Sequence, residues 1–227
     1  MLQVERLSIH FADREEVQEV VRGISFSVQD GEIVGIVGES GSGKTMTALT
    51  IAGLFKEHAV LDAGTIRLDG TDLLKLTERE MRQVQGNRIG MIFQEPMTAL
   101  NPTMKIGRQV EEVLRLHTDL DSRARKAAVI RALEEVELDE AEKLLFKYPH
   151  ELSGGMRQRV MIAAAMICRP SLLIADEPTT ALDAATQESI LKLLKKLNDK
   201  YGMSILFISH NLRVVKELCT RVFVMKD

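Results

Sequence analysis

Residues 32–45 read EIVGIVGESGSGKT and join a short apolar run, a glycine-rich loop and the start of a helical pattern. The run is bounded by glycines and predicts a strand that is buried on both faces, as in a parallel sheet. A helical pattern follows from Lys44 to about Leu54. The order of strand, loop and helix predicts an α/β core built around this loop.

The loop GESGSGKT, residues 38–45, matches the full spacing G-x-x-x-x-G-K-[S/T], which in this context predicts a phosphate-binding loop. Glycines let the backbone approach phosphate, and successive N–H groups at a helix N-terminus form a nest for an anion. We expect Lys44 to reach the β- and γ-phosphates and the Thr45 hydroxyl to bind Mg²⁺. The alternative is a glycine-rich turn without a ligand. The residues assigned to nucleotide binding are Gly38, Glu39, Ser40, Gly41, Ser42, Gly43, Lys44 and Thr45.

Two adjacent carboxylates follow each other at the end of a second apolar run, LLIADE, at residues 172–177. A lone carboxylate at the end of a buried strand is costly without a cation, so Asp176 is predicted to hold Mg²⁺ through water. The next residue, Glu177, is predicted to polarise the water that attacks the terminal phosphate. The alternative for Glu177 is an acidic loop residue that merely lies near the metal.

The chain has 227 residues, with 30 Lys and Arg against 33 Asp and Glu, so the formal net charge is −3. This balance and an aromatic content of 4% argue against a nucleic-acid-binding surface, and we expect no nucleic acid among the partners. Cys168 and Cys219 lie far apart and are predicted to be free thiols in a reducing compartment. No apolar run reaches about 18 residues and the N-terminus is too polar for a signal peptide, which predicts a cytosolic protein or a peripheral membrane subunit.

Short strand patterns alternate with helical patterns along the rest of the chain. Segments 2–11 and 20–28 flank a charged turn at 12–19. Strands are expected at 65–70, 88–93, 172–176, 204–209 and from 221 onward, and a helix is expected at 186–198. Strands that alternate with helices predict an α/β domain with a largely parallel sheet.

Residues 108–147 differ from this pattern, because they contain neither Gly nor Pro and 18 of these 40 residues are charged. Apolar residues recur at helical spacing, as at Val110, Val113 and Leu114. The stretch predicts two or three amphipathic helices whose charged faces are solvated. With a further helix after Ser153, it predicts a helical subdomain at about residues 95–168, inserted into the core.

The motifs occur in an order that resembles a known family. GESGSGKT, then LSGGM at 152–156, then LLIADEPTTALD at 172–183, with His210 downstream, resemble the ATP-binding subunit of ABC transporters. The resemblance covers essentially the whole chain. It implies a single ATPase domain over residues 1–227, with a P-loop NTPase core, a mostly parallel sheet, an N-terminal antiparallel β part and the inserted helical subdomain. The family continues beyond the final pattern RVFVMKD, so we expect a chain truncated at its C-terminus, and the alternative is a short protein.

The resemblance assigns roles to further residues. Phe11, at the end of the first strand, looks like the aromatic side chain that stacks on adenine. Gln94 resembles the Q-loop glutamine, which contacts Mg²⁺ or its water and links the core to the helical subdomain. His210 resembles the switch histidine near the γ-phosphate, and Asp183 resembles the D-loop aspartate. The residues that the resemblance makes catalytic are Lys44, Gln94, Glu177 and His210, and those that it makes metal-binding are Thr45, Gln94 and Asp176.

The segment LSGGM resembles the family's signature, formed here by Ser153, Gly154, Gly155 and Met156. In the family, two subunits form a head-to-tail dimer. Each ATP is held by the phosphate loop of one subunit and by the signature helix N-terminus of the other, a suitable place for an anion. Asp183 is expected to couple the two sites. The alternative is a well-capped helix start followed by solvated arginines.

Met156 stands where the commonest family form has Gln, and it points to a subgroup. The segments PHELSGGMRQRV and FQEPMTALNP strongly resemble the ATPases of dipeptide, oligopeptide and nickel importers. The resemblance implies a motor that couples hydrolysis of ATP with Mg²⁺ to uptake of peptides or nickel, at the cytoplasmic face of the cell membrane. The partners that it implies are a second ATPase subunit, identical or different, two transmembrane permease subunits and, indirectly, an extracytoplasmic substrate-binding protein.

Two other functions compete with this interpretation. A non-transport ABC ATPase, acting in DNA repair or on ribosomes, usually carries a long coiled-coil insertion, zinc modules or two cassettes, and the sequence has none of these patterns. A metabolic P-loop kinase needs an acceptor site and leaves the LSGGM and TALD segments unexplained.

Overall fold

The computed structural model describes residues 1–12, 17–55, 59–180 and 182–226. Residues 13–16 of the charged turn expected at 12–19 lie outside these residues, and the turn was predicted too long, because β1 includes Ala12 and β2 begins at Val17. The helices and strands in chain order are β1 (Leu2–Ala12), β2 (Val17–Val28), β3 (Ile33–Gly38), α1 (Lys44–Ile51), β4 (Ala59–Leu68), β5 (Thr71–Asp72), η1 (Leu73–Lys75), α2 (Glu78–Val84), β6 (Ile89–Ile92), α3 (Pro96–Ala99), α4 (Ile106–His117), α5 (Ser122–Glu135), α6 (Ala141–Leu144), η2 (Pro149–Glu151), α7 (Gly154–Met166), β7 (Leu172–Asp176), α8 (Ala184–Tyr201), β8 (Ser204–Ile208), α9 (Leu212–Leu218) and β9 (Arg221–Met225).

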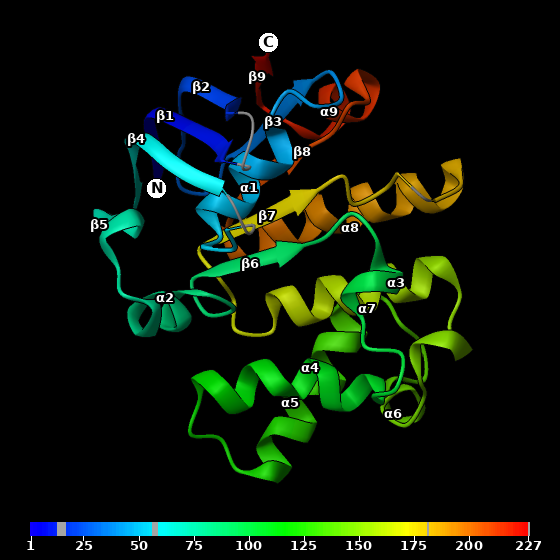
Figure 1. Cartoon of the computed structure of the whole chain (residues 1–227). Coiled ribbons are helices and arrows are strands. Elements are labelled where there is room, and N and C mark those ends of the chain that lie inside the picture. The colour runs from blue at the N-terminus through cyan, green and yellow to red at the C-terminus, as the bar shows by residue number, and fades with distance from the viewer. Residues whose placement is uncertain (13–16, 56–58, 181, 227) are drawn as a thin grey trace.

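Two sheets make up the β part of the molecule (Figure 1). One sheet is antiparallel, with the strand order β2–β1–β4–β5, and the other is parallel, with the order β6–β7–β8–β3–β9. The α/β fold with a parallel sheet and an N-terminal antiparallel part is therefore confirmed. The strand β3 lies inside the parallel sheet, between β8 and β9, and the glycine-rich loop follows it directly.

The inner strands of the parallel sheet are largely apolar because they contribute to two hydrophobic cores. On β8, Ile205 and Phe207 belong to the core shared with the helices, whereas Leu206 and Ile208 belong to the core shared with the antiparallel sheet. All four side chains are fully buried. Burial on both faces is the physical reason for unbroken apolar runs such as ILFI at residues 205–208.

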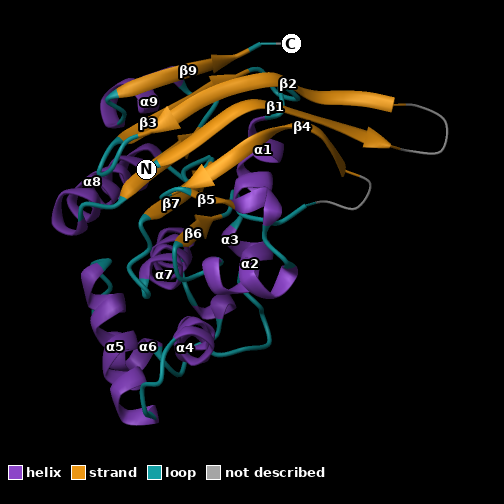
Figure 2. Cartoon of the chain, turned by 90° about the vertical axis from the view of Figure 1, so that its left-hand side faces the viewer, coloured by secondary structure: helices purple, strands orange, loops and turns teal. Residues whose placement is uncertain are grey.

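The helices α4, α5 and α6 occupy the charged stretch, and they lie on the far side of the parallel sheet from β1, β2 and β4 (Figure 2). The helix α5 packs on α4 and α6, and α4 and α5 both pack on α7 through their apolar faces. Val110 and Leu114 are buried as expected, whereas Val113 is only half-buried. No helix in the described part of the chain is both long and apolar enough to cross a membrane.

Candidate functional site

The predicted phosphate loop connects the end of β3 to the start of α1. Gly43 precedes α1 with a φ of 85°, and a Cβ there would lie 2.4 Å from the carbonyl oxygen of Val20. The positive φ and this close approach both require glycine. Because glycine has no side chain that could cap the helix, the first N–H groups of α1 are left to bind an anion.

Lys44 is the first residue of α1, and only 6% of it is exposed. Its ammonium group donates to the carbonyl oxygens of Gly38 at 2.9 Å and of Glu39 at 2.6 Å. The hydroxyl of Ser42 lies 3.4 Å from the same nitrogen. The loop backbone thus holds this positive charge within the segment where phosphate is predicted to bind.

Thr45 joins the phosphate loop to the end of β7, because its hydroxyl donates to Oδ1 of Asp176 at 3.2 Å. Asp176 is almost completely buried, with 3% of its surface exposed. Mg²⁺ prefers hard oxygen ligands and is usually bound by one or two carboxylates together with substrate phosphates and water. Among the described residues, no three His, Cys, Asp or Glu side chains form a group that could hold a metal. The pair therefore fits an Mg²⁺ ion shared with a nucleotide better than one held by protein alone.

Three side chains meet at one carboxylate oxygen of Glu177. Nε2 of Gln94 donates to this oxygen, Oε2, at 3.3 Å, and the hydroxyl of Thr180 donates to it at 2.9 Å. Nδ1 of His210 lies 3.0 Å from the same oxygen. Gln94, Glu177 and His210 follow the neighbouring strands β6, β7 and β8, whose carboxyl ends share one edge of the sheet, the usual position of ligand sites in such folds.

The backbone of Glu177 is held in an unusual conformation. Its φ is 47°, in the left-handed region, which costs a residue with a side chain about 1–2 kcal/mol. Its N–H group donates to the carbonyl oxygen of Ile208 at 2.9 Å, which ties the turn to β8. Strain of this kind persists where the surrounding structure imposes it, and here it occurs at the acid that contacts Gln94, Thr180 and His210.

Nine of the residues predicted to bind nucleotide or Mg²⁺ or to act in catalysis line one pocket of about 540 Å³. This volume is within the usual range for small-molecule sites. Asp176 and the remaining loop residues lie behind the pocket, in contact with Thr45 and Lys44. Sequence reasoning missed Thr180, although a hydroxyl three residues after a proposed catalytic acid was a usable signal. It also missed Val20 and Met46. The residues that line this pocket are Phe11, Val20, Ser40, Gly41, Gly43, Lys44, Thr45, Met46, Gln94, Glu177, Thr180 and His210.

The signature segment lies outside the pocket that contains the phosphate loop. Ser153 is the N-cap of α7, and its hydroxyl accepts a hydrogen bond from the N–H of Met156 at 3.3 Å. Ser153, Gly155 and Met156 line a second pocket of about 560 Å³, whose described lining contains no residue of the phosphate loop. One copy of the chain therefore does not bring the two anion-facing segments into a common pocket.

Asp183 lies beside the signature segment rather than in the phosphate pocket. It is the N-cap of α8, and its carboxylate accepts hydrogen bonds from the N–H of Thr186 at 3.0 Å and from the Thr186 hydroxyl at 2.7 Å. The backbone hydrogen bond from Thr186 is the main reason that the pKa of Asp183 lies below its usual value. A Cβ on Gly155 would lie only 2.8 Å from the methyl carbon of Thr186.

Both cysteines are free thiols that line neither pocket. Burial raises the pKa of Cys168 and raises that of Cys219 to about 12. At neutral pH both therefore remain protonated, and neither is a candidate nucleophile.

Known proteins match this chain over most of its length. Residues 21–180 match the protein family described as ABC transporter. The chain is 48% identical to a probable peptide ABC transporter ATP-binding protein of Sinorhizobium fredii, over 99% of this chain and 68% of the relative. It is 46% identical to the oligopeptide transport ATP-binding protein AppD of Bacillus subtilis, over 99% of this chain and 69% of the relative. It thus spans about two thirds of the length of these relatives.

Solved structures show the same architecture. A dimeric structure of the ATP-binding cassette MJ0796, in a post-hydrolysis state bound to ADP and Pi, superposes with a TM-score of 0.88 at 29% identity, covering 100% of this chain and 94% of that one. The structure of cbiO1 from Clostridium perfringens, part of an ABC transporter complex, has a TM-score of 0.83 at 28% identity and covers 99% of this chain and 84% of that one. The chain therefore belongs to the ABC transporter family, of which it is an ATPase cassette.

Proposed function

We propose that the chain is the ATP-hydrolysing motor of a membrane importer and that the pocket between the phosphate loop and Glu177 is its active site. The observation that carries this proposal is the convergence of Gln94, Thr180 and His210 on one oxygen of Glu177, in the pocket that also contains Lys44. An acid placed next to a phosphate-binding lysine can bind and polarise a water molecule for attack on phosphate.

The proposed reaction is an in-line attack of water on the γ-phosphorus. The new bond between oxygen and phosphorus forms as the bond from phosphorus to the ADP oxygen breaks, so no covalent enzyme intermediate arises. Glu177 accepts the hydrogen bond from the water and receives its proton. Lys44 and the loop N–H groups stabilise the negative charge on the phosphate oxygens, and His210 donates to the γ-phosphate. Phe11 stacks on the adenine ring at the pocket wall.

Thr45, Asp176 and Gln94 are proposed to hold Mg²⁺ together with the nucleotide. The hydrogen bond of 3.2 Å between Thr45 and Asp176 supports this assignment, because it shows that the hydroxyl and the buried carboxylate lie close enough to bind one ion. When bound, the ion supplies positive charge that offsets the negative charge of the β- and γ-phosphates.

We also propose that two ATPase subunits share each nucleotide. Ser153 and the backbone of Gly154 and Gly155 then contact the γ-phosphate held by the phosphate loop of the partner subunit. The separation of the signature segment from the chain's own phosphate pocket supports this arrangement, and the similar cassette MJ0796 is described as dimeric. Hydrolysis removes hydrogen bonds from both subunits at once, which opens the dimer. Asp183 is proposed to couple the two sites.

The proposed cargo is a peptide, because the similar proteins of Sinorhizobium fredii and Bacillus subtilis are described as peptide and oligopeptide transport proteins. The proposed partners are two transmembrane permease subunits and a second ATPase subunit at the cytoplasmic face of the membrane. An extracytoplasmic binding protein delivers the cargo to the permeases. The helices from α3 to α7 are proposed to act as one subdomain that contacts the permeases.

Replacing Glu177 by Gln tests the active site, because the amide keeps the size of the carboxylate but cannot accept a proton. We expect the Kd for ATP with Mg²⁺ to stay within about threefold and turnover to fall by about 10² to 10⁴-fold. Glu188→Gln, at an exposed position on α8, is the matched control and is expected to retain turnover. Normal turnover in Glu177→Gln removes Glu177 from the proposed role.

The shared site is tested by light scattering of the Glu177→Gln protein over a range of concentrations, with and without ATP and Mg²⁺. We expect the mass to change from monomer to dimer when the nucleotide is added. A protein that binds ATP and remains monomeric contradicts pairing between identical chains, and the search then turns to a distinct ATPase subunit.

A further inference from the structure

The starts of α7 and α8 are packed so closely that a side chain on Gly155 does not fit between them. A Cβ there would lie 2.8 Å from the methyl carbon of Thr186. Thr186 cannot easily turn away, because its hydroxyl and its N–H both donate to the carboxylate of Asp183. The signature segment and the cap of α8 therefore form one packed unit.

Arg159 joins this unit to a third helix. It lies one turn after Gly155 on α7, and its guanidinium group donates to the Ser189 hydroxyl of α8 at 2.7 Å. The other terminal nitrogen donates to the carbonyl oxygen of Val136 and to Glu137 at 3.1 Å, just after the end of α5. Only 15% of the Arg159 side chain is exposed. One side chain thus connects α7, α8 and the end of α5.

The hydrogen bond between Arg159 and Glu137 joins two charged side chains. The backbone of Glu137 has a φ of 60°, and its carboxylate accepts hydrogen bonds from Lys196 of α8 at 2.9 Å as well as from Arg159. The hydrogen bond from Lys196, and then that from Arg159, hold the pKa of Glu137 below its usual value. The carboxylate is therefore ionised at neutral pH, where hydrogen bonds between charged groups are stronger than neutral ones.

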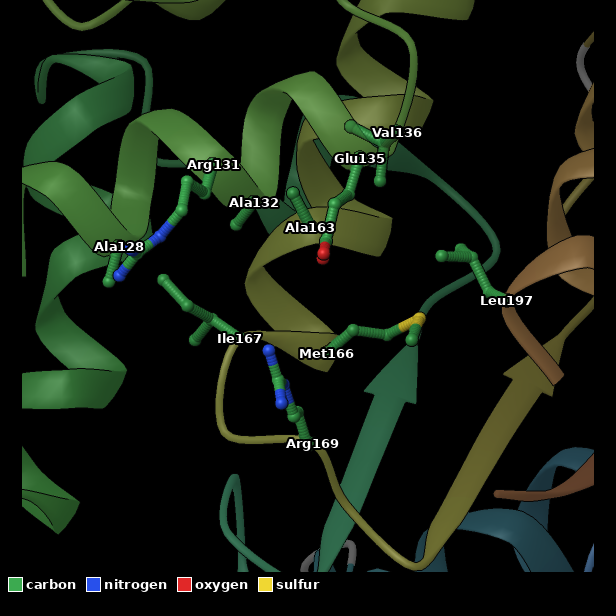
Figure 3. Close-up of a pocket in the computed structure, with 10 residues that line it drawn as sticks. All are labelled: Ala128, Arg131, Ala132, Glu135, Val136, Ala163, Met166, Ile167, Arg169 and Leu197. Carbon is green, nitrogen blue, oxygen red and sulfur yellow. The ribbon is translucent and has the colours of Figure 1, made fainter. Parts of the chain in front are cut away.

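The end of α5 that Arg159 contacts also borders a gap in the packing, because Glu135 and Val136 line it. Figure 3 shows a small pocket there, of about 90 Å³, between α5, the end of α7 and Leu197. Beside it, Glu135 of α5 accepts hydrogen bonds from Lys200, at 2.8 Å, and from Tyr201. The hydrogen bonds from Arg159 to Val136 and Glu137 therefore tie this end of α5 to α7 beside the gap.

We infer that Arg159 is a positioning residue for the shared nucleotide site, which holds Ser153 to Gly155 in a set position against the start of α8. This inference rests on the proposed function, because a fixed signature segment matters only if it meets a partner's nucleotide. The alternative drawn from the sequence was that the arginines after the signature segment are solvated, and the low exposure of Arg159 and its three hydrogen bonds exclude this for Arg159. Arginine suits this place because its planar group donates in two directions at once, which lysine cannot reproduce.

The first experiment is hydrogen exchange of the monomer without nucleotide. Ser189→Ala removes the bond to α8 and leaves the bonds to Val136 and Glu137 intact. We expect the N–H groups of Met156 and Thr186, which bind the two helix caps, to exchange about threefold faster or more. Ser122→Ala, the same change at an exposed position on α5, is the control and leaves both rates unchanged. Unchanged rates in Ser189→Ala overturn the inference.

The second experiment places Ser189→Ala or Arg159→Ala in the Glu177→Gln protein and measures two constants. We expect the Kd of the monomer for ATP to change less than about twofold, because neither residue lines the phosphate pocket. The Kd for ATP-dependent dimerisation should rise about tenfold. Arg123→Ala, at an exposed position on α5, is the control for the loss of an arginine.

The outcomes separate this inference from the proposed function. A dimerisation Kd that is unchanged in Ser189→Ala contradicts the positioning role, even if Arg159→Ala weakens the dimer or does not fold. If the Glu177→Gln parent binds ATP but never dimerises, a site shared between identical chains is wrong. In that case the exchange rates still decide whether Arg159 holds the helices together.

Discussion

The phosphate loop and the signature segment both place glycine at a helix N-terminus, but their surroundings differ. Lys44 lies within the phosphate loop, and the carboxylates of Asp176 and Glu177 lie close to it. The signature helix instead begins with a serine cap, and Gly155 is pressed against α8. The first segment thus supplies charge and reacting groups, whereas the second supplies backbone N–H groups whose position depends on neighbouring helices.

The largest expected difference between the two regions is in binding of ATP by the monomer. Lys44→Ala removes a buried positive charge from the phosphate loop, and we expect the Kd for ATP with Mg²⁺ to rise about 100-fold. Ser153→Ala changes only the signature cap and should leave this Kd within about twofold. Titration calorimetry at fixed salt checks both values. If Ser153→Ala strongly weakens binding of ATP by the monomer, the signature segment also contributes to the chain's own nucleotide site, and the proposed difference between the two regions is wrong.

The second largest expected effect is a change in the Mg²⁺ concentration that ATP hydrolysis requires. Asp176→Asn keeps the shape of the side chain but removes a charge, and we expect the Mg²⁺ concentration needed for half-maximal ATP hydrolysis to rise at least about tenfold. Asp199→Asn, at an exposed position on α8, serves as the control. An unchanged Mg²⁺ requirement in Asp176→Asn places the ion on other ligands.

The two signature glycines should respond differently to alanine. A Cβ on Gly154 meets only Leu182, at 3.8 Å, so Gly154→Ala should stabilise the monomer by up to about 1 kcal/mol through helix propensity. Gly155→Ala forces Thr186 to move and should destabilise the monomer by about 1–3 kcal/mol. Urea unfolding of both proteins measures the difference. Equal stabilities contradict tight packing between α7 and α8.

The smallest expected effect is a difference between the two helix caps in how their stability depends on pH. The folded pKa of Asp183 is lowered, so its cap stabilises α8 above the unfolded pKa of about 4 and is lost as the pH falls through the folded pKa. Protection of the Thr186 N–H against exchange should therefore fall in acid, and less so in Asp183→Asn. Ser153 carries no charge, so protection of the Met156 N–H should not show this dependence. A matching fall at both caps points to general acid unfolding instead.

Features that depend on neighbouring residues in the chain were predictable. The loop from Gly38 to Thr45 forms between a strand and a helix because glycines and an apolar run are local signals. Apolar spacing in the charged stretch likewise predicted helices, although Val113 is less buried than its spacing suggested. Thr180 was missed although it lies only three residues after Glu177, a spacing that a turn brings within hydrogen-bonding distance.

The amino-acid sequence by itself determined the alternation of strands and helices, the phosphate loop and the acids at the end of β7, because each depends on periodicity or on adjacent residues. Tertiary structure alone decided which distant side chains meet. Pairing of β6, β7 and β8 brought Gln94 and His210 to Glu177. Packing of α7 against α8 made Arg159 a link between helices, where the sequence had left a solvated arginine as an alternative. The physical reason is that such contacts arise from burial and hydrogen bonding between segments far apart in sequence, which no local pattern encodes.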